Sequence, residues 1–283
     1  MNQSFRLDVL IYAHDGRGLG HASRSIGIGL ALRRLYPERK VLFVSGCRFS
    51  SELIGAGPLD WIKLPSYETK VVNGTSKGVT GNSMFSDREL GEIRAREIEH
   101  LVAFYRPRIV LVDHTPQGKH KELVPALSRT VSSDTLWVLG VRGIIGAVSQ
   151  AKSELARSLF HNHYHSLLWY GDSVVLGTSH LDRMREQYAV DPVECGYVLR
   201  LAEYGLSNNL KHESAAALAG TISIPWLGEK TTGFLSQLAT ALATIPKSYG
   251  MWHLYIDPGP SPEGQESVDR LFSAIDCCLL EPP

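Results

Sequence analysis

The opening of the chain changes its hydrophobic period once, and the change predicts a strand followed by a helix. Residues 7–13 contain no breaker and are rich in Val, Ile and Tyr, which is typical of a strand buried on both faces. From Ala22 the apolar positions recur every three or four residues up to Leu35, which is typical of an amphipathic helix. Strand, turn and helix in this order begin a doubly wound α/β domain.

The same alternation of strands and helices continues to about residue 200. Further strands are predicted at 41–45, 59–64, 108–113, 135–141 and 173–176. Further helices are predicted at 49–54, 86–105 and 150–170, and another beginning near residue 119. The strands do not alternate with polar residues, as expected for a parallel sheet covered by helices. Residues 1–200 are therefore predicted to form an N-terminal Rossmann-like doubly wound parallel sheet.

Two segments of this domain carry local patterns. Ser86 and Glu89 form a capping box at the start of helix 86–105, whose buried stripe is predicted to comprise Leu90, Ile93, Leu101 and Phe104. Residues 65–85 contain three glycines among Asn, Ser and Thr and have no apolar period, so we expect a long loop of the kind that often binds ligands.

The pattern changes after Leu201. Residues 201–220 contain two adjacent asparagines and an alanine-rich stretch, and we expect them to connect two domains. A second series follows, with strand 221–225, helix 231–244, strand 251–257 and helix 263–274. Residues 221–283 are predicted to form an incomplete second α/β domain, because they make up about half of a ~150-residue domain.

Composition narrows the classes of function. Lys plus Arg and Asp plus Glu balance at 29 each, so net charge does not favour nucleic acid as a partner. The four cysteines have no Cys-x-x-Cys spacing and are expected to be reduced thiols. No apolar run approaches the about 18–20 residues of a membrane span, and the first strand is too short and too soon followed by glycines for a signal peptide. We therefore expect a cytoplasmic protein.

The turn after the first strand is the strongest candidate for chemistry. Gly16, Gly18 and Gly20 stand at alternate positions between His14 and His21. Glycines allow positive φ and let a ligand approach backbone N–H groups at a helix N-terminus, where an anion is favoured. The alternative is a tight turn that binds no ligand.

Two familiar glycine loops do not fit this turn. A Walker A loop ends in Gly-Lys-Ser/Thr, whereas Gly20 is followed by His21 and Ala22. A dinucleotide fingerprint requires an acid at the end of the second strand, where this chain has Ser45 followed by Gly46. We therefore do not expect a nicotinamide dehydrogenase.

The loop resembles the first glycine loop of GT-B glycosyltransferases, especially the group related to the bacterial transferase that adds N-acetylglucosamine to the peptidoglycan lipid intermediate. Those proteins carry a Gly-x-Gly-His segment between the first strand and helix, and Gly18-Leu19-Gly20-His21, with Arg24 one turn later, matches it. Segments 64–70, 111–118 and 195–200 also look like parts of predicted members of this group.

The resemblance implies a transferase that moves a sugar from a nucleotide-sugar donor, UDP-linked by expectation, to an acceptor hydroxyl. The first domain would hold the acceptor and the second the donor. A metal and other cofactors are not required, because helix N-termini and arginines can stabilise the departing diphosphate.

Histidines and one acid are the candidate catalytic residues. His21 is the first candidate for the general base and His14 the second, because imidazole can accept a hydroxyl proton near neutral pH. Asp113 and His114 follow a predicted strand, at the sheet edge where α/β folds bind ligands. They are interpreted as a general base, His114, with the carboxylate of Asp113 that orients it, or as two side chains that hold the acceptor. Alternatively, Asp113 caps the next helix.

Two arginines are candidates for diphosphate binding. Arg24 and Arg142 could neutralise a diphosphate, and each could equally be a surface residue. The resembled group often has Arg-Asp where this chain has Arg142-Gly143, so the role of that acid is missing here.

The second domain departs from the resembled group. Its first strand is followed by residues 226–230, which contain one glycine instead of a glycine-rich donor loop, and the chain ends before a later glycine-rich segment. Three interpretations remain open: a truncated reading frame, a partner chain or self-association that completes the donor site, or a non-catalytic binding protein that lost it. Epimerase or phosphate-ester chemistry in the same fold is a further alternative.

Residues 161–165, His-Asn-His-Tyr-His, suggest a metal site at first sight. On the predicted helix, His161 and His165 share a face but His163 points away, and no Cys or carboxylate stands nearby. Partly exposed histidines are the favoured interpretation, and no metal is predicted.

Overall fold

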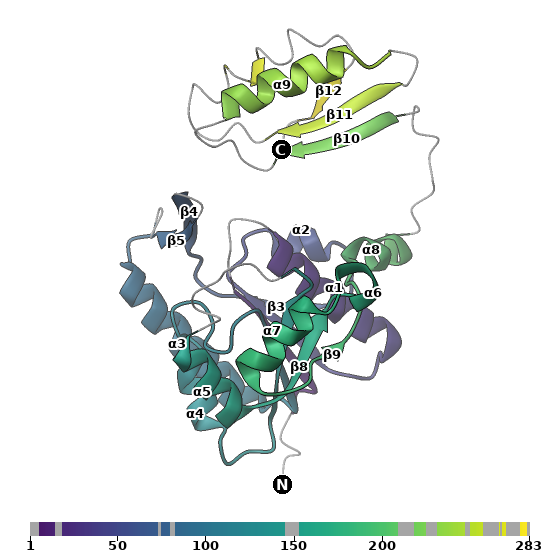
Figure 1. Cartoon of the computed structure of the whole chain (residues 1–283). Coiled ribbons are helices and arrows are strands. Elements are labelled where there is room, and N and C mark those ends of the chain that lie inside the picture. Colours follow the sequence, from purple (N-terminus) through teal and green to yellow (C-terminus); the bar gives the residue numbers. More distant parts are fainter. Residues whose placement is uncertain are drawn as a thin grey trace. The chain divides into compact units, whose positions relative to one another are not determined.

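The computed structural model contains two compact units, Met1–Leu210 and Lys211–Pro283, each with its own parallel sheet (Figure 1). The structure describes residues 6–14, 19–72, 75–79, 83–144, 153–208, 218–224, 231–246, 250–256, 266, 268–269 and 278–281.

The first unit is built on a seven-stranded sheet with the order β3-β2-β1-β6-β7-β8-β9. All neighbouring strands in it are parallel. The strands are β1 Val9–Ala13, β2 Val41–Ser45, β3 Asp60–Lys63, β6 Ile109–Asp113, β7 Leu136–Arg142, β8 Tyr164–Tyr170 and β9 Val193–Glu194. The predicted Rossmann-like doubly wound parallel sheet is confirmed.

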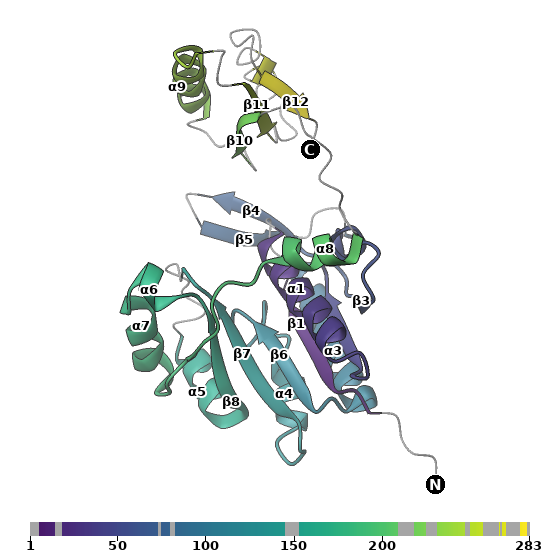
Figure 2. The same ribbon diagram turned by 90° about the vertical axis from the view of Figure 1, so that its right-hand side faces the viewer.

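The strand order reverses between β1 and β6, because β2 lies on one side of β1 and β6 on the other. Figure 2 shows β1, β6, β7 and β8 side by side. The two strands are in register from Val9 opposite Ile109 to Tyr12 opposite Val112. Their carboxyl ends therefore lie side by side. In open α/β sheets this reversal opens a crevice in which ligands bind.

Helices cover both faces of this sheet. They are α1 Gly20–Leu35, α2 Ser50–Ile54, α3 Asp87–Tyr105, α4 Val124–Arg129, α5 Glu154–His163, α6 Ser173–Leu176, α7 Ser179–Tyr188 and α8 Arg200–Asn208. Leu10 and Tyr12 belong to the core formed with α3, α4, α5 and α7, whereas Ile11 and Ala13 belong to the core formed with α1 and α2. Burial on both faces explains why the strand sequences are continuously apolar.

Helix α3 confirms one prediction and corrects another. The capping box of Ser86 and Glu89 is present at its start. Its buried residues, however, are Leu90, Arg94, Ile98 and Val102, while Phe104 is 62% exposed. The stripe follows a strict four-residue spacing that places an arginine in the core, and a charged residue there was not expected from the apolar pattern.

The predicted helix 150–170 is confirmed only over residues 154–163, and the predicted strand 173–176 is wrong. Helix α5 ends at His163, and residues 164–170 form strand β8 between β7 and β9. Aromatic residues at 164, 169 and 170 favour a strand. Residues 173–176 form helix α6, because the Asp172 side chain accepts a hydrogen bond from the Val174 N–H and caps it.

The expected long loop at 65–85 contains a hairpin. Strands β4 Glu68–Val72 and β5 Thr75–Val79 pair antiparallel, with Val72 opposite Thr75. The two residues between them in sequence are Asn and Gly, the pair favoured at two-residue hairpin turns. The helix predicted to begin near residue 119 is also corrected, since α4 begins at Val124.

The second unit has a three-stranded parallel sheet with the order β10-β11-β12. Its elements are β10 Leu218–Ile224, α9 Thr231–Ala243, β11 Met251–Ile256 and β12 Cys278–Glu281. A small core includes Leu235, Leu254 and Ile256. Residues 226–230, and all of the predicted helix 263–274 except 266 and 268–269, lie outside the described residues. Within the described part of the chain, none of the helices combines the length and the apolar character needed to cross a membrane.

Candidate active site

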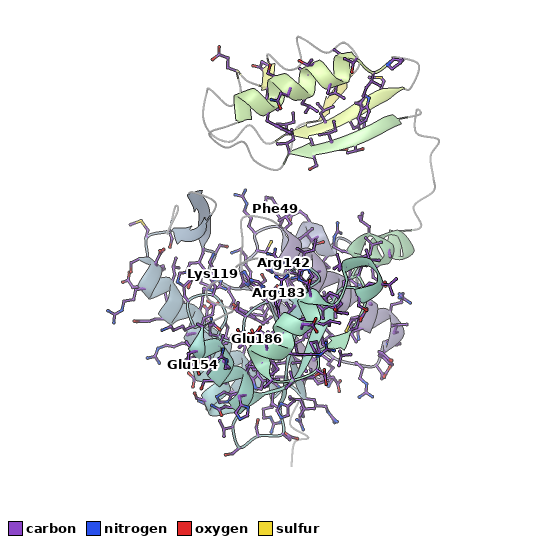
Figure 3. All side chains as sticks on the ribbon, in the orientation of Figure 1. Phe49, Lys119, Arg142, Glu154, Arg183 and Glu186 are labelled. Carbon is purple, nitrogen blue, oxygen red and sulfur yellow. The ribbon has the colours of Figure 1, made fainter. Side chains whose placement is uncertain are left out.

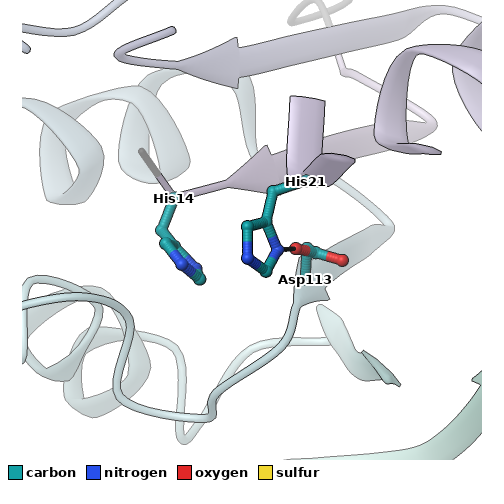
Figure 4. Close-up of side chains that lie close together, drawn as sticks. All are labelled: His14, His21 and Asp113. Carbon is teal, nitrogen blue, oxygen red and sulfur yellow. Dashed lines mark hydrogen bonds and ion pairs between the residues drawn. The ribbon is translucent and has the colours of Figure 1, made fainter. Parts of the chain in front are cut away.

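Four predicted site residues converge where β1 and β6 end. His14 follows β1, His21 lies in the first turn of α1, Asp113 ends β6, and His114 follows it. Figure 4 shows His14, His21 and Asp113 together, with the His21 ring between the other two side chains. The fold therefore joins residues from two distant segments at the point where the strand order reverses.

Asp113 is bound by two partners and is 3% exposed. Its Oδ2 contacts Nδ1 of His21, and its Oδ1 accepts hydrogen bonds from Nη2 and Nε of Arg24, the latter at 3.0 Å. Burial alone would raise the pKa of Asp113, but the hydrogen bond from His21 and the charges of His21 and Arg24 hold this pKa below its usual value. Asp113 is thus an ionised acceptor and not the cap of the next helix.

The ionised carboxylate fixes the orientation of His21. Because Asp113 can only accept, Nδ1 of His21 carries the proton that it donates, and Nε2 is the ring nitrogen that remains to exchange a proton with a ligand. The His21 side chain is 18% exposed, so it lies at the rim of the site. Together these two residues have the geometry of an oriented general base.

Three imidazole rings lie close together around this pair. The ring centroids are 4.0 Å apart for His14 and His21, 5.1 Å for His21 and His114, and 5.4 Å for His14 and His114. Nδ1 of His14 and Nδ1 of His114 are buried and have no hydrogen-bond partner among the described residues. Burial lowers the pKa of His14 well below its usual range and that of His114 to about 4. Both rings are therefore neutral near pH 7.

The loop after β6 has an unusual backbone. His114, Gly118, His120 and Lys121 have positive φ, which is 82° at His114. The His114 N–H donates to the Gly140 carbonyl at 2.8 Å, which holds this conformation. A residue other than glycine in this region costs energy and is found most often at binding and catalytic sites.

A buried ion pair anchors the same loop. Glu122 accepts hydrogen bonds from Nε and Nη2 of Arg94 at 2.6 and 2.9 Å, and also from the Tyr12 hydroxyl. Arg94 further donates to the Pro65 carbonyl at 2.5 Å, and the side chains of both charged residues are fully buried. The network ties the loop to α3 and to β1. The sequence pattern does not predict this ion pair, because Glu122 falls in the helix expected from about residue 119 and has no recognisable partner in the sequence.

Tyr170 supports the site from β8. The Arg24 guanidinium carbon lies 5.7 Å from the centre of the Tyr170 ring. The Tyr170 hydroxyl passes so close to Gly140 that a Cβ there would lie 2.1 Å from it. The wrong prediction for residues 164–170 hid this role, since a tyrosine at the end of a helix would not reach Arg24.

Arg142 and Lys119 lie near the cluster, in the upper part of the first unit as drawn in Figure 3. The charge of Arg142 contributes to lowering the pKa of His114, and that of Lys119 to lowering the pKa of His14. The guanidinium of Arg24, by contrast, is engaged by Asp113.

The glycine turn is described in part. Gly20 begins α1, whose first turn has no acidic residue and no side-chain cap. Gly16 and Gly18 lie outside the described residues. The predicted roles of these glycines, Arg24, His114 and Arg142 in phosphate binding remain predictions.

A cavity of about 840 Å³ opens beside the loop that follows β6. Gln117, Gly118, His120 and Lys121 line one side of it. The first turns of α3 and the start of α5 line the other.

The described residues contain one group of His, Cys, Asp or Glu side chains close enough to hold a metal ion, formed by His14, His21 and Asp113. The His-Asn-His-Tyr-His segment is not such a group. His161 and His163 end α5, whereas His165 lies on β8 and accepts a hydrogen bond from the Trp137 N–H.

Solved structures with the same architecture are numerous. S. aureus MnaA in a co-structure with UDP aligns with 98% of this chain and 68% of its own, with a TM-score of 0.61 and 10% identity. UDP-GlcNAc 2-epimerase from Neisseria meningitidis bound to UDP-GlcNAc aligns with 98% of this chain and 72% of its own, with a TM-score of 0.59 and 10% identity. A glycosyltransferase from Rickettsia africae aligns with 98% of this chain and 68% of its own, with a TM-score of 0.54 and 9% identity. The chain has a GT-B-like fold.

These likenesses concern the fold alone, because identities are 9–10%. No protein-family model matches the sequence, and no curated protein sequence matches it. The particular relation to the peptidoglycan lipid-intermediate transferase stays a prediction. The proteins of this fold include a glycosyltransferase and a UDP-GlcNAc 2-epimerase.

Proposed function

We propose that the protein is a glycosyltransferase that moves a sugar from a nucleotide-sugar donor, UDP-linked by preference, to an acceptor hydroxyl. The observation that carries the proposal is the pairing of His21 with the buried carboxylate of Asp113 where β1 and β6 end, at the reversal of the strand order. The solved structures of the same fold that hold UDP or UDP-GlcNAc support the choice of donor.

The proposed reaction is a single displacement. The acceptor oxygen forms a bond to the anomeric carbon while the bond from that carbon to the diphosphate oxygen breaks, and the nucleoside diphosphate leaves with the electron pair. Nε2 of His21 takes the acceptor proton, and Asp113 stabilises the imidazolium that forms. Arg142 and the N-terminus of α1 would offset the negative charge on the diphosphate.

His21 is favoured over His14 as the base for two reasons. His21 has a carboxylate on its other ring nitrogen and reaches the rim of the site. His14 has no hydrogen-bond partner on Nδ1 among the described residues, and its pKa is well below the usual range, so it is a weaker base. We assign His14 and His114 to the wall that contacts the acceptor.

The test is a donor panel with purified protein, read as nucleoside diphosphate release and as product by mass spectrometry. UDP-, GDP- and dTDP-sugars are offered with and without simple glycoside acceptors. We expect turnover with one donor class and a fall in kcat of about 10²–10⁴ in His21→Ala. His161→Ala, an exposed histidine of α5, is the matched control and should keep full activity.

Two outcomes contradict the proposal. A product with retained anomeric configuration excludes the single displacement. Full activity of His21→Ala excludes this residue as the base.

Epimerisation is the second candidate, because a 2-epimerase is among the proteins of the same fold. It needs no acceptor, so conversion of UDP-GlcNAc alone into a sugar epimer would support it over transfer. If the protein binds a UDP-sugar and converts it in neither assay, the non-catalytic binding alternative is favoured.

A further inference from the structure

The arrangement of the three histidines suggests a second property of the site. His14, His21 and His114 come from β1, α1 and the loop after β6, and their centroids are 4.0–5.4 Å apart. In a tetrahedral zinc site, where each imidazole nitrogen lies about 2.0–2.1 Å from the ion, the ring centroids lie about 5 Å apart. The observed spacing is close to this value.

The free nitrogen atoms are on the correct rings. Nδ1 of His14 and Nδ1 of His114 are buried and have no hydrogen-bond partner among the described residues. A buried polar atom without a partner is costly, and a bound ligand can satisfy it. His114 also holds a left-handed backbone conformation, with φ 82°, that directs its ring into the cluster.

Asp113 occupies the opposite side of His21. It contacts Nδ1, and Arg24 Nη2 lies 3.3 Å from the same nitrogen, so that side of the ring is closed. Nε2 is the nitrogen left for an ion, and Figure 4 shows His14 on the side of the His21 ring away from Asp113. A carboxylate on the far nitrogen of a histidine ligand is the usual arrangement around protein-bound metals.

We propose that His14, His21 and His114 bind one divalent transition-metal ion, with Asp113 as the carboxylate that orients His21. Zn²⁺, Co²⁺ and Ni²⁺ suit a donor set of three imidazoles, whereas Mg²⁺ and Ca²⁺ prefer oxygen ligands. Donor atoms of His14, His21 and Asp113 lie within 4.8 Å of one another. Metal binding therefore requires side-chain rotations that bring a His114 nitrogen to the ion on the Nε2 side of His21, while Asp113 stays on Nδ1.

The ion blocks sugar transfer. It takes the Nε2 lone pair of His21, which can then no longer accept a proton from the acceptor hydroxyl. This consequence, unlike the metal site itself, rests on the proposed function. The metal-free protein is thus the active form, and a bound transition-metal ion is an inhibitor.

The binding test uses the full chain without a histidine tag and titrates it with Co²⁺, following the visible absorption bands of the bound ion. We expect one ion per chain. His14→Ala and His114→Ala should each weaken Co²⁺ affinity at least about 10-fold, and Asp113→Asn about 10- to 100-fold. His161→Ala should bind as the native sequence does, and Mg²⁺ should not displace Co²⁺.

The proposal is overturned if the native sequence shows no saturable Co²⁺ binding, or if His14→Ala and His114→Ala bind as tightly as it does. Circular dichroism verifies folding, and His14→Gln and His114→Gln replace any alanine variant that fails to fold. In the activity assay, Co²⁺ should abolish transfer and EDTA should restore it. Absence of transfer in metal-free protein would refute the proposed function, while the titration alone decides the metal site.

Discussion

Two buried carboxylates of the first unit have similar partners and opposite surroundings. Glu122 is paired with Arg94, and Asp113 with Arg24. Around Glu122 the tyrosine, the arginine and a backbone carbonyl complete the hydrogen bonds, and both charged side chains are fully buried. Around Asp113, two histidine nitrogens lack partners among the described residues, and His21 and Arg24 keep 18% and 14% of their side chains exposed.

The difference distinguishes a structural ion pair, Glu122 with Arg94, from the pair of Asp113 and Arg24, which we propose is functional. We call the hydrogen bonds around Glu122 and Arg94 the closed network, because its polar atoms are used by one another and it serves only to position the chain. We call the group of Asp113, Arg24 and the three histidines the open network, because its unpartnered nitrogens can bind a ligand and exchange protons. The two networks touch through the loop that runs from His114 to Glu122, so the closed pair holds the open one in place.

The largest expected effect is on stability and comes from breaking the closed pair. Glu122→Ala leaves the Arg94 guanidinium buried without its counter-charge, and we expect the free energy of unfolding to fall by about 3–5 kcal/mol. Urea denaturation measures it. The double variant Arg94→Met/Glu122→Leu is the control and should recover much of the loss. A loss below about 1 kcal/mol in Glu122→Ala would show that water reaches the pair.

Removing the open carboxylate should affect activity more than stability. Asp113→Asn keeps the size of the side chain but no longer fixes the tautomer of His21, so kcat should fall about 100-fold or more. The unfolding free energy should change less than in Glu122→Ala, because Arg24 reaches solvent. Asp134→Asn, which removes an exposed carboxylate paired with Arg6, is the matched control for lost charge. Equal kcat in Asp113→Asn and the native chain would remove the distinction between the two networks.

The pH dependence of stability should come from the open network. His14 and His114 have lowered pKa values in the folded protein, about 4 for His114, so between about pH 6.5 and 4.5 the unfolded chain binds protons that the folded chain does not. The free energy of unfolding therefore decreases as pH falls, by at most about 1.4 kcal/mol per pH unit for each histidine. The contribution of Asp113 is lost only at lower pH, below its unfolded pKa of about 3.9.

Urea unfolding at pH 7, 6 and 5 measures this slope. His114→Gln should reduce it, and His161→Gln should leave it unchanged. A slope that is the same in all three proteins would mean that His114 titrates normally in the folded state.

The smallest effect is expected for an ion pair that belongs to neither network. Arg88 and Glu92 on α3 lie 3.0 Å apart with side chains 87% and 62% exposed. Arg88→Ala should change the unfolding free energy by at most about 0.5 kcal/mol, and added salt should reduce even that. A larger loss would mean that burial is not what distinguishes the ion pairs of this protein.

Sequence patterns predict where the candidate site residues lie better than they predict the ends of the later helices and strands. The continuous apolar strands 41–45 and 108–113 and the helix that begins beside His21 follow from local periodicity. They already place His14, His21, Asp113 and His114 at one sheet edge. Strand β8 was missed because its aromatic residues continue the apolar pattern of α5, and only its pairing with β7 decides between strand and helix.

The contacts within the site could not be predicted. The pairing of His21 with Asp113, the commitment of Arg24 to the same carboxylate, and the buried position of Arg94 all depend on side chains that are far apart in sequence. Local patterns contain no information about such partners. A single sequence shows the candidates, whereas the fold selects which of them meet.

His21 and Asp113 are 92 positions apart, and they meet only because β6 inserts beside β1. A chain emerging from the ribosome has no such site until β6 has been made and paired. Whatever occupies the cluster consequently binds the native chain and not the nascent or unfolded one, and adds RT ln(1 + [L]/Kd) to its stability. The concentration of the ligand in the cell would thereby determine the fraction of the protein that stays folded, as well as its proposed turnover rate.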